Sequence, residues 1–181
     1  MNSPTPGQAL TSTVMEKVKT PALKIKFCNN TKPFYYDNSP DIPRYSVTCV
    51  VEPEKHKDFV KIFTNIEKNE KIKQSVLKPE VTKQDGNFVN TGNWIVKFTD
   101  KKPIRVVVRD GDRLVPFDES EDVAYGQDVS VEFDILRYTK RGTTESGLSL
   151  KPILITIIKN AAPAVNVATK SKQILDEEDL F

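Results

Sequence analysis

Basic and aromatic side chains are interleaved along this sequence, in segments where polar and apolar residues alternate. Tyr138 illustrates the pattern, because it lies next to Arg137 and close to Lys140 and Arg141. Cations that follow phosphates, together with rings on which bases stack, are what binding of single-stranded nucleic acid requires. The candidate residues for such an interface are Lys24, Lys26, Tyr35, Tyr36, Trp94, Lys97, Arg105, Arg109, Arg137, Tyr138, Lys140, Arg141 and Lys151.

Each candidate also has a purely structural interpretation. Basic side chains on the solvent face of a strand protect sheet edges and maintain solubility. Trp94 is ambiguous, since it is in phase with the apolar Val96 and Phe98 but lies close to Lys97. In the run 34–36, at least one of three consecutive rings must point away from the core, because successive strand side chains face opposite sides.

Residues that would support catalysis are scarce. The single histidine, His56, lies among charged residues and is expected on the solvated face of a helix. The two cysteines, Cys28 and Cys49, are expected to be reduced, buried and too few for a zinc site. We find neither a glycine-rich phosphate loop nor a nucleophile elbow. The sequence therefore predicts no enzyme, no metal and no cofactor.

Alternation of apolar and polar residues predicts a mainly β chain. In the first expected strand, Leu23, Ile25 and Phe27 form the buried face. Residues 53–69 alone have helical periodicity, and the turn signals Asp85-Gly86 and Asp110-Gly111 interrupt the later strands. The expected strands span residues 22–28, 44–51, 93–99, 103–109, 128–138 and 148–158. This order favours a small antiparallel barrel or a sandwich with one helix between strands.

Composition divides the 181 residues into four parts. Residues 1–20 are expected to be a mobile arm, 21–159 the folded body and 160–173 a flexible linker, followed by a tail at 174–181. The start of the chain lacks an apolar signal segment, and no apolar run is long enough to cross a membrane. These observations predict a cytoplasmic protein without membrane contact.

The tail carries the most distinctive residue pattern. Asp176, Glu177, Glu178 and Asp179 are followed by Leu180 and Phe181. Removing these four acids from the 25 acidic residues leaves 21 against 27 basic ones, so the rest of the chain carries +6 although the whole carries +2. A ring beside acids and a free carboxylate suits capture by a pocket on a partner protein.

This tail resembles that of single-stranded-DNA-binding proteins, above all the phage-encoded ones of short-tailed coliphage type. Two body segments also look similar, Tyr125-Gly126-Gln127-Asp128-Val129 and Gly147-Leu148-Ser149-Leu150. The resemblance implies an OB-fold body that binds single-stranded DNA in phage replication and recombination. It also implies a tail that contacts DNA polymerase and helicase or primase, and that occupies the DNA groove when DNA is absent. The resemblance does not assign a base-stacking role to any individual residue of this chain.

Two other functions stay open at this point. A structural β-sandwich protein of a phage particle would need neither a basic body nor a docking tail. A nuclease would need clustered carboxylates or histidines. Whether the chain forms a homodimer is also left open.

Overall fold

The computed structural model describes residues 12–118 and 120–159. The linker, the tail and the first eleven residues of the expected arm lie outside the described residues. Residues 12–19, which we expected in the arm, instead form the first strand. The elements are β1 Ser12–Lys19, β2 Leu23–Tyr36, β3 Ser39–Val51, α1 Lys57–Asn69, β4 Leu77–Gln84, β5 Asn87–Asp100, β6 Arg105–Asp110, β7 Arg113–Pro116, β8 Asp128–Thr139 and β9 Ser146–Ile158.

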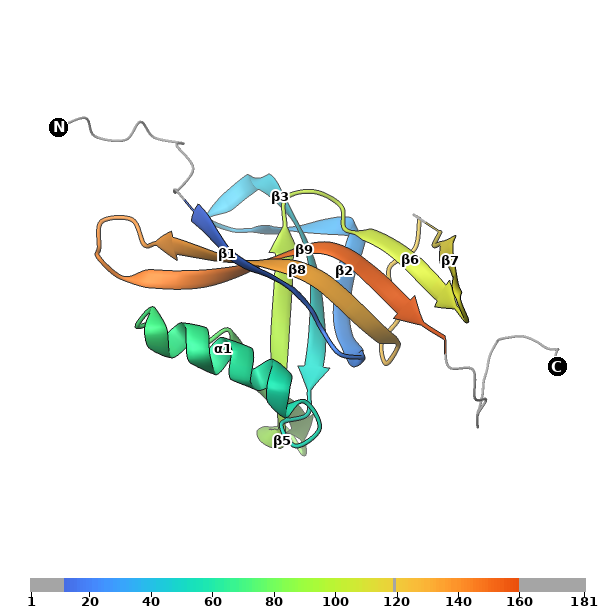
Figure 1. Ribbon diagram of the computed structural model, residues 1–181, viewed down its shortest axis with the longest axis horizontal. Helices are drawn as coiled ribbons and strands as arrows, with labels where there is room; N and C mark the ends of the chain where they lie inside the picture. The colour runs from blue at the N-terminus through green and yellow to red at the C-terminus, as the bar shows by residue number, and fades with distance from the viewer. Residues whose placement is uncertain (1–11, 119, 160–181) are drawn as a thin grey trace.

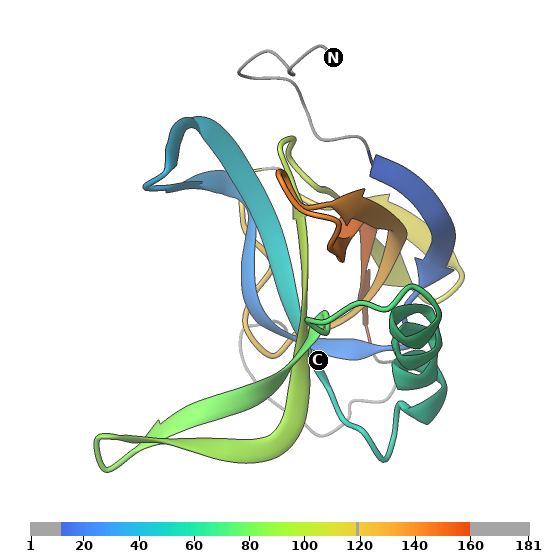
Figure 2. The same ribbon diagram turned by 90° about the vertical axis from the view of Figure 1, so that its left-hand side faces the viewer.

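The described strands form one strongly curved sheet (Figures 1 and 2). Its order is β4-β5-β3-β2-β8-β9-β6-β7, and β1 pairs with β8 outside this path. Neighbours are antiparallel except β6 and β9, which are parallel. The prediction of a mainly β chain with one helix is confirmed. The sheet is not closed into a barrel, however, since β5 and β9 approach each other without forming a ladder.

Aromatic side chains from the sheet and the helix meet in the core. The rings of Phe98 on β5 and Phe133 on β8 have centroids 4.7 Å apart. Phe63 of α1 stacks on Phe133 at 6.2 Å, and Phe59 meets the edge of Phe63 at 5.0 Å. The helix therefore covers one face of the sheet with the apolar stripe that its periodicity predicted.

Phe27 lies on the opposite face from the one that alternation predicts. In the β2–β3 ladder, Ile25 pairs with Cys49 but Phe27 pairs with Thr48, so two residues of β2 match one of β3. This β-bulge shifts the register, so Phe27 changes face relative to a regular strand, and further shifts follow after Asn29 and after Phe34. Phe27 is consequently 60% exposed, on the outer face of the sheet.

The cysteine thiols are unpaired and poorly ionised. Cys49 is buried and Cys28 is half-buried. Burial raises the pKa of both thiols, to about 11 for Cys28. Both thiols therefore stay protonated at neutral pH. Cys49 is buried as we expected, whereas Cys28 is half-buried and its thiol donates to Oδ1 of Asn30 over 3.1 Å.

The expected solvated position of His56 is wrong, because the side chain is only 7% exposed. The turn before α1 folds back, with the His56 N–H donating to the Glu52 carbonyl over 2.8 Å. The Glu52 N–H in turn donates to Nδ1 of His56 over 3.0 Å, which requires the neutral ring. Burial lowers the pKa of His56 below its ordinary value.

We expect His56 to make the folded state sensitive to mild acid. Its pKa is lower in the folded than in the unfolded chain, so the unfolded chain takes up a proton first as the pH falls below about 6.5. The free energy of unfolding, measured with urea from pH 8 to pH 5, should therefore decrease over this range. His56→Asn keeps an acceptor for Glu52 without titrating, and should show a smaller decrease. An equal decrease in both proteins would assign the effect to other groups.

Candidate nucleic-acid interface

A groove of about 660 Å³ brings together side chains from the outer face of the sheet and from the β8–β9 hairpin. Its aromatic and basic lining residues are Tyr36, Arg44, Lys78, Lys97, Tyr138 and Lys140. None of the described residues that line it is acidic. The groove therefore combines stackable rings with an excess of positive charge.

Cross-strand pairing forms a compact cluster of rings and cations at one side of the groove. Phe34 pairs with Arg44 in the β2–β3 ladder, and Lys97 lies opposite Thr48 in the β3–β5 ladder. The Lys97 ammonium lies 4.9 Å from the centroid of the Phe34 ring, and the Arg44 guanidinium 5.9 Å from that of Tyr36. Cation–π attraction of this kind holds the basic side chains beside the rings.

Arg44 has a buried donor that the protein does not satisfy. Its Nη1 is inaccessible to solvent and has no hydrogen-bond partner among the described residues. Buried polar groups are nearly always hydrogen-bonded, and a guanidinium matches the paired oxygens of a phosphate. Nη1 itself could meet a phosphate only after the side chain moves, but Arg44 lines the groove and its guanidinium has the geometry for a phosphate, so it is a candidate for a phosphate contact.

Tyr138 is positioned by a glycine on the neighbouring strand. Tyr138 and Gly147 are directly paired in the β8–β9 ladder. A Cβ atom added to Gly147 would lie 2.5 Å from Cζ and from the hydroxyl oxygen of Tyr138. The ring therefore lies directly over Gly147, half-buried, and can keep this position only because residue 147 has no side chain.

Lys140 contributes less charge to the groove than the other cations. Its ammonium lies 3.3 Å from Glu145 in the β8–β9 loop, which also pairs with Lys73 over 3.3 Å. Hydrogen bonds from Lys73 and Lys140 lower the pKa of Glu145, so this carboxylate is charged at neutral pH.

The groove contains only part of the predicted interface. Of the thirteen candidates, it brings together Tyr36, Lys97, Tyr138 and Lys140. Ion pairs hold Lys24 to Asp128 over 3.0 Å and Arg137 to Glu70 over 2.9 Å. Trp94 packs against the core, which resolves its ambiguous phase. The remaining candidates outside the groove lining are Lys26, Tyr35, Arg105, Arg109, Arg141 and Lys151.

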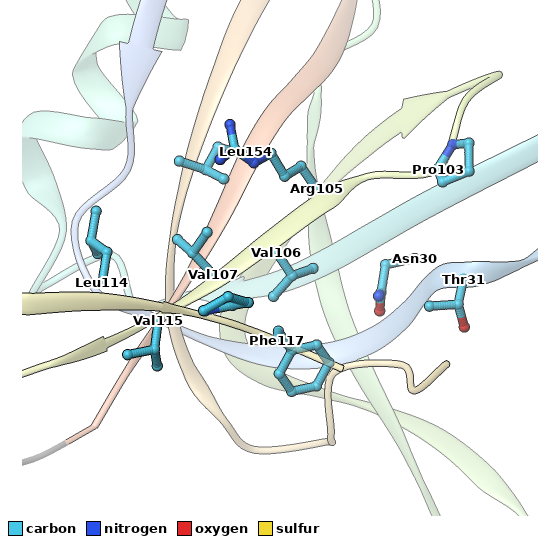
Figure 3. A pocket seen from close by; sticks show the side chains of 11 residues that line it. Asn30, Thr31, Pro103, Arg105, Val106, Val107, Leu114, Val115, Phe117 and Leu154 are labelled. Carbon is cyan, nitrogen blue, oxygen red and sulfur yellow. The ribbon is translucent and has the colours of Figure 1, made fainter. Parts of the chain in front are cut away.

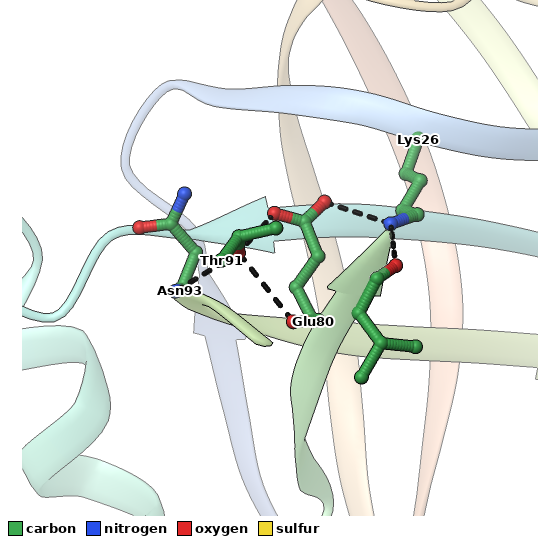
Figure 4. A network of polar contacts seen from close by, with 5 residues as sticks. Lys26, Glu80, Thr91 and Asn93 are labelled. Carbon is green, nitrogen blue, oxygen red and sulfur yellow. Dashed lines mark hydrogen bonds and ion pairs between the residues drawn. The ribbon is translucent and has the colours of Figure 1, made fainter. Parts of the chain in front are cut away.

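Lys26 belongs to a structural network (Figure 4). Its ammonium donates to Glu80 over 2.8 Å, and the Thr91 hydroxyl donates to the other carboxylate oxygen over 2.8 Å. Burial alone would raise the pKa of Glu80, but the hydrogen bonds from Lys26 and Thr91 outweigh it and lower this pKa. The network ties the β4–β5 hairpin to β2.

We expect Lys26→Ala to affect stability more than DNA binding. Glu80 would lose its cation in a half-buried position, which should destabilise the fold by about 1–3 kcal/mol. Its affinity for a short oligo(dT) should change less than that of Lys97→Ala. Urea unfolding and fluorescence titration of both variants measure the two effects. A larger loss of affinity in Lys26→Ala than in Lys97→Ala, with normal stability, would place Lys26 in the interface.

A second cavity of about 910 Å³ lies beside the β6–β7 hairpin (Figure 3). Its lining is mainly apolar and includes Val107, Leu114 and Phe117. Arg105 is the only basic side chain among the described residues that line it. One cation in an apolar cavity does not suit a phosphate chain, so the smaller groove is the better candidate.

Three side chains at the groove were missed in the sequence, and a fourth, on the outer face of the sheet, was misplaced. Lys78 was not considered because no aromatic residue stands next to it in the sequence, and Arg44 was not considered although Tyr45 follows it directly. Phe34 was noted only as part of an aromatic run, and Phe27 was assigned to the core. Arg44 starts an alternating strand, and counting back from the buried Val47 would have placed it on the outer face. No sequence signal marks the bulge that exposes Phe27.

The described residues hold no group of three or more histidines, cysteines or acids that would ligate a metal ion. No helix within residues 12–118 and 120–159 is long and apolar enough to cross a membrane.

Comparison with known proteins identifies similar folds. No protein-family model and no curated protein matches the chain. A C-terminal truncation of the single-stranded DNA-binding protein from bacteriophage Enc34 superposes with a TM-score of 0.55 at 17% identity, over 82% of this chain and 88% of that one. The same phage protein in complex with single-stranded DNA gives 0.56 at 16% identity, over 81% and 88%. The T7 phage single-stranded DNA-binding protein gp2.5 gives 0.50 at 12% identity, over 86% and 98%. The chain therefore has the fold of phage-type single-stranded-DNA-binding proteins.

Proposed function

We propose that this chain binds single-stranded DNA in the groove between the outer face of β3 and β5 and the β8–β9 hairpin. The observation that carries the proposal is the composition of the groove. Two tyrosines and four basic side chains line it, and no acid does. The shared fold supports the proposal, because one of the similar structures was determined in complex with single-stranded DNA.

The groove suits binding that depends little on base sequence. Arg44, Lys78 and Lys97 can pair with phosphates, while the rings of Tyr36 and Tyr138 offer apolar faces to any base. Specific readout would need side chains that form paired hydrogen bonds to base edges, and the aromatic and basic residues here do not provide them in a fixed array. The protein would thus cover and protect single strands without catalysing a reaction.

Fluorescence titration with oligo(dT), a mixed-sequence oligonucleotide and duplex DNA tests this proposal. We expect the two single strands to bind with similar affinity and the duplex to bind more weakly, because paired bases do not expose their faces for stacking. Preference for the duplex, or no binding to any of the three, would refute it.

The proposal extends to the acidic tail, on sequence alone. Residues 174–181 would recruit DNA polymerase and helicase or primase during phage replication and recombination, in the host cytoplasm. Acids attract a basic pocket, and Leu180 and Phe181 provide apolar anchors. A homodimer is not included in the proposal.

We expect the tail to act on DNA and on partner proteins by different physical means. Deleting residues 174–181 removes four acids, so affinity for oligo(dT) should rise at low salt and return towards that of the full chain as screening increases. Phe181→Ala retains the acids, so it should leave DNA affinity unchanged but weaken binding to the replication proteins. Titration and pull-down with both variants distinguish the effects. If neither variant differs from the full chain, the tail has no recruiting role.

A further inference from the structure

The β4–β5 hairpin projects from the body as a two-stranded arm (Figure 2). Every residue from 81 to 92 is exposed, whereas the parts of the same strands near Leu77 and Val96 are buried. The arm has no core of its own, so its apolar residues contribute to stability only through cross-strand pairs and not through burial. Its apolar side chains therefore need another explanation.

Three large apolar residues of this arm face solvent. Phe88 is 76% exposed, Val81 44% and Val89 41%. Phe88 pairs with Lys83 across the two strands, so a ring and a cation share one face near the tip. This is the same combination of groups that lines the groove.

The arm is fixed at its base. The ion pair between Lys26 and Glu80 and the hydrogen bond from Thr91 to Glu80 both lie where the hairpin leaves the body. They also turn the carboxylate of Glu80 towards Lys26 of β2 (Figure 4). The other acid of the arm, Asp85, occupies the turn with a positive φ of 49°. Between the base of the arm and its turn, the two strands present Lys83 together with the apolar Val81, Phe88 and Val89.

The arm is also continuous with the groove. Lys78 of β4 and Lys97 of β5 line the groove, and the same two strands run outward to Lys83 and Phe88. At about 3.3 Å per strand residue, Phe88 lies roughly 30 Å along β5 from Lys97. In the β4–β5 ladder, Lys83 and Phe88 are in phase with the buried pair Leu77 and Val96, and therefore lie on the other face of the two strands from Lys78 and Lys97. A single strand that leaves the groove over Lys97 would reach Phe88 by crossing the edge of the arm.

We infer that the arm is a second contact site for the same single-stranded DNA, where Phe88 stacks on a base and Lys83 pairs with a phosphate. This inference rests on the proposed function. It implies that the protein covers more nucleotides than the groove alone can hold. It also implies that removing the arm contact weakens the binding only of DNA strands that are long enough to reach the arm.

The test compares oligonucleotides of eight and sixteen thymidines with the full-length chain, under excess DNA so that one chain binds each oligonucleotide. We expect Phe88→Ala to weaken binding of the longer strand roughly fivefold or more, since a base would lose its stacking partner. Binding of the shorter strand should stay within about twofold, because the groove alone can accommodate it within the range of OB-fold site sizes. Tyr125→Ala is the matched control, because Tyr125 is an even more exposed ring, at 82%, in the loop before β8.

Lys83→Gln gives an independent readout that does not depend on stacking. The log–log salt dependence should become shallower by about 0.7 for the longer strand and remain unchanged for the shorter one. Both effects support the inference if they are confined to the longer strand.

Three results would contradict it, and they are distinguishable. If the unmodified chain binds neither oligonucleotide, the proposed function fails together with the inference. If it binds both, but Phe88→Ala behaves like Tyr125→Ala, only the arm contact is refuted. If Phe88→Ala instead changes the sedimentation coefficient while DNA binding stays the same, the arm joins copies of this chain and the DNA contact is again refuted.

Discussion

Replacement of Tyr138 by alanine should lower the affinity for single-stranded DNA by roughly 1–3 kcal/mol, the contribution of one base stacked on an aromatic ring. The ring lies over Gly147 at the edge of the groove, next to Lys140 in sequence and outside the buried cluster of the core. Its loss removes a stacking surface without opening a cavity. Fluorescence titration with oligo(dT) measures the affinity, and thermal unfolding should show little change.

Two further variants test separately whether the hydroxyl group of Tyr138 and the position of its ring contribute to the affinity. Tyr138→Phe keeps the stacking surface and should bind like the unmodified chain. Gly147→Ala places a Cβ atom where the ring lies, so the ring must move and affinity should fall although Tyr138 is intact. Unchanged affinity in Tyr138→Ala together with a large fall in melting temperature would show that Tyr138 belongs to the core.

The largest effect on stability is expected at Phe133. Its ring is fully buried and contacts Phe98, Phe63 and Phe59, which come from both the sheet and the helix. Phe133→Ala would leave a cavity that these rigid rings cannot fill, so the free energy of unfolding should decrease by about 3–5 kcal/mol. Urea unfolding measures the decrease, provided that the variant still folds.

Phe27→Ala is the matched control for this prediction. It removes the same atoms from a position that is 60% exposed on the outer face of the sheet. The free energy of unfolding should change by no more than about 0.5 kcal/mol. Equal destabilisation by the two substitutions would contradict the placement of Phe27 outside the core.

Local patterns in the sequence are sufficient to predict most of the fold. Alternation identified the buried face of β8, where Val129, Val131, Phe133 and Ile135 are all inaccessible. Helical spacing identified Phe59 and Phe63 as the buried side of α1. Both predictions succeed because one periodic element packs against one core, and periodicity records which side faces it.

The deviations arise where tertiary structure overrides periodicity. The bulge that exposes Phe27 depends on how β2 pairs with β3, and the burial of His56 depends on a turn that folds back onto Glu52. β6 pairs with β9 in parallel, whereas we expected an antiparallel arrangement. None of these features leaves a local signature in residue type.

The groove was predictable only in part, because it is assembled from distant segments. Tyr138 and Lys97 were identified from their position opposite apolar residues. Arg44 acquires its role only through the register that sets it beside Phe34 and close to Lys97. Such a register combines residues from three strands, and a single sequence gives no information about which strands become neighbours.

The most direct test of the central claim is the salt dependence of single-strand binding in the unmodified chain and in Arg44→Gln/Lys97→Gln. Each phosphate that a basic side chain neutralises contributes about −0.7 to the slope of log affinity against log salt concentration. If both side chains pair with phosphates in the groove, the double variant should bind oligo(dT) more weakly and its slope should be shallower by about 1.4. The matched control is Arg105→Gln/Arg109→Gln, which removes the same charge from β6, outside the groove lining, and should retain the slope of the unmodified chain. Equal slopes in the unmodified chain and the Arg44→Gln/Lys97→Gln variant would contradict the assignment of this groove as the DNA-binding site.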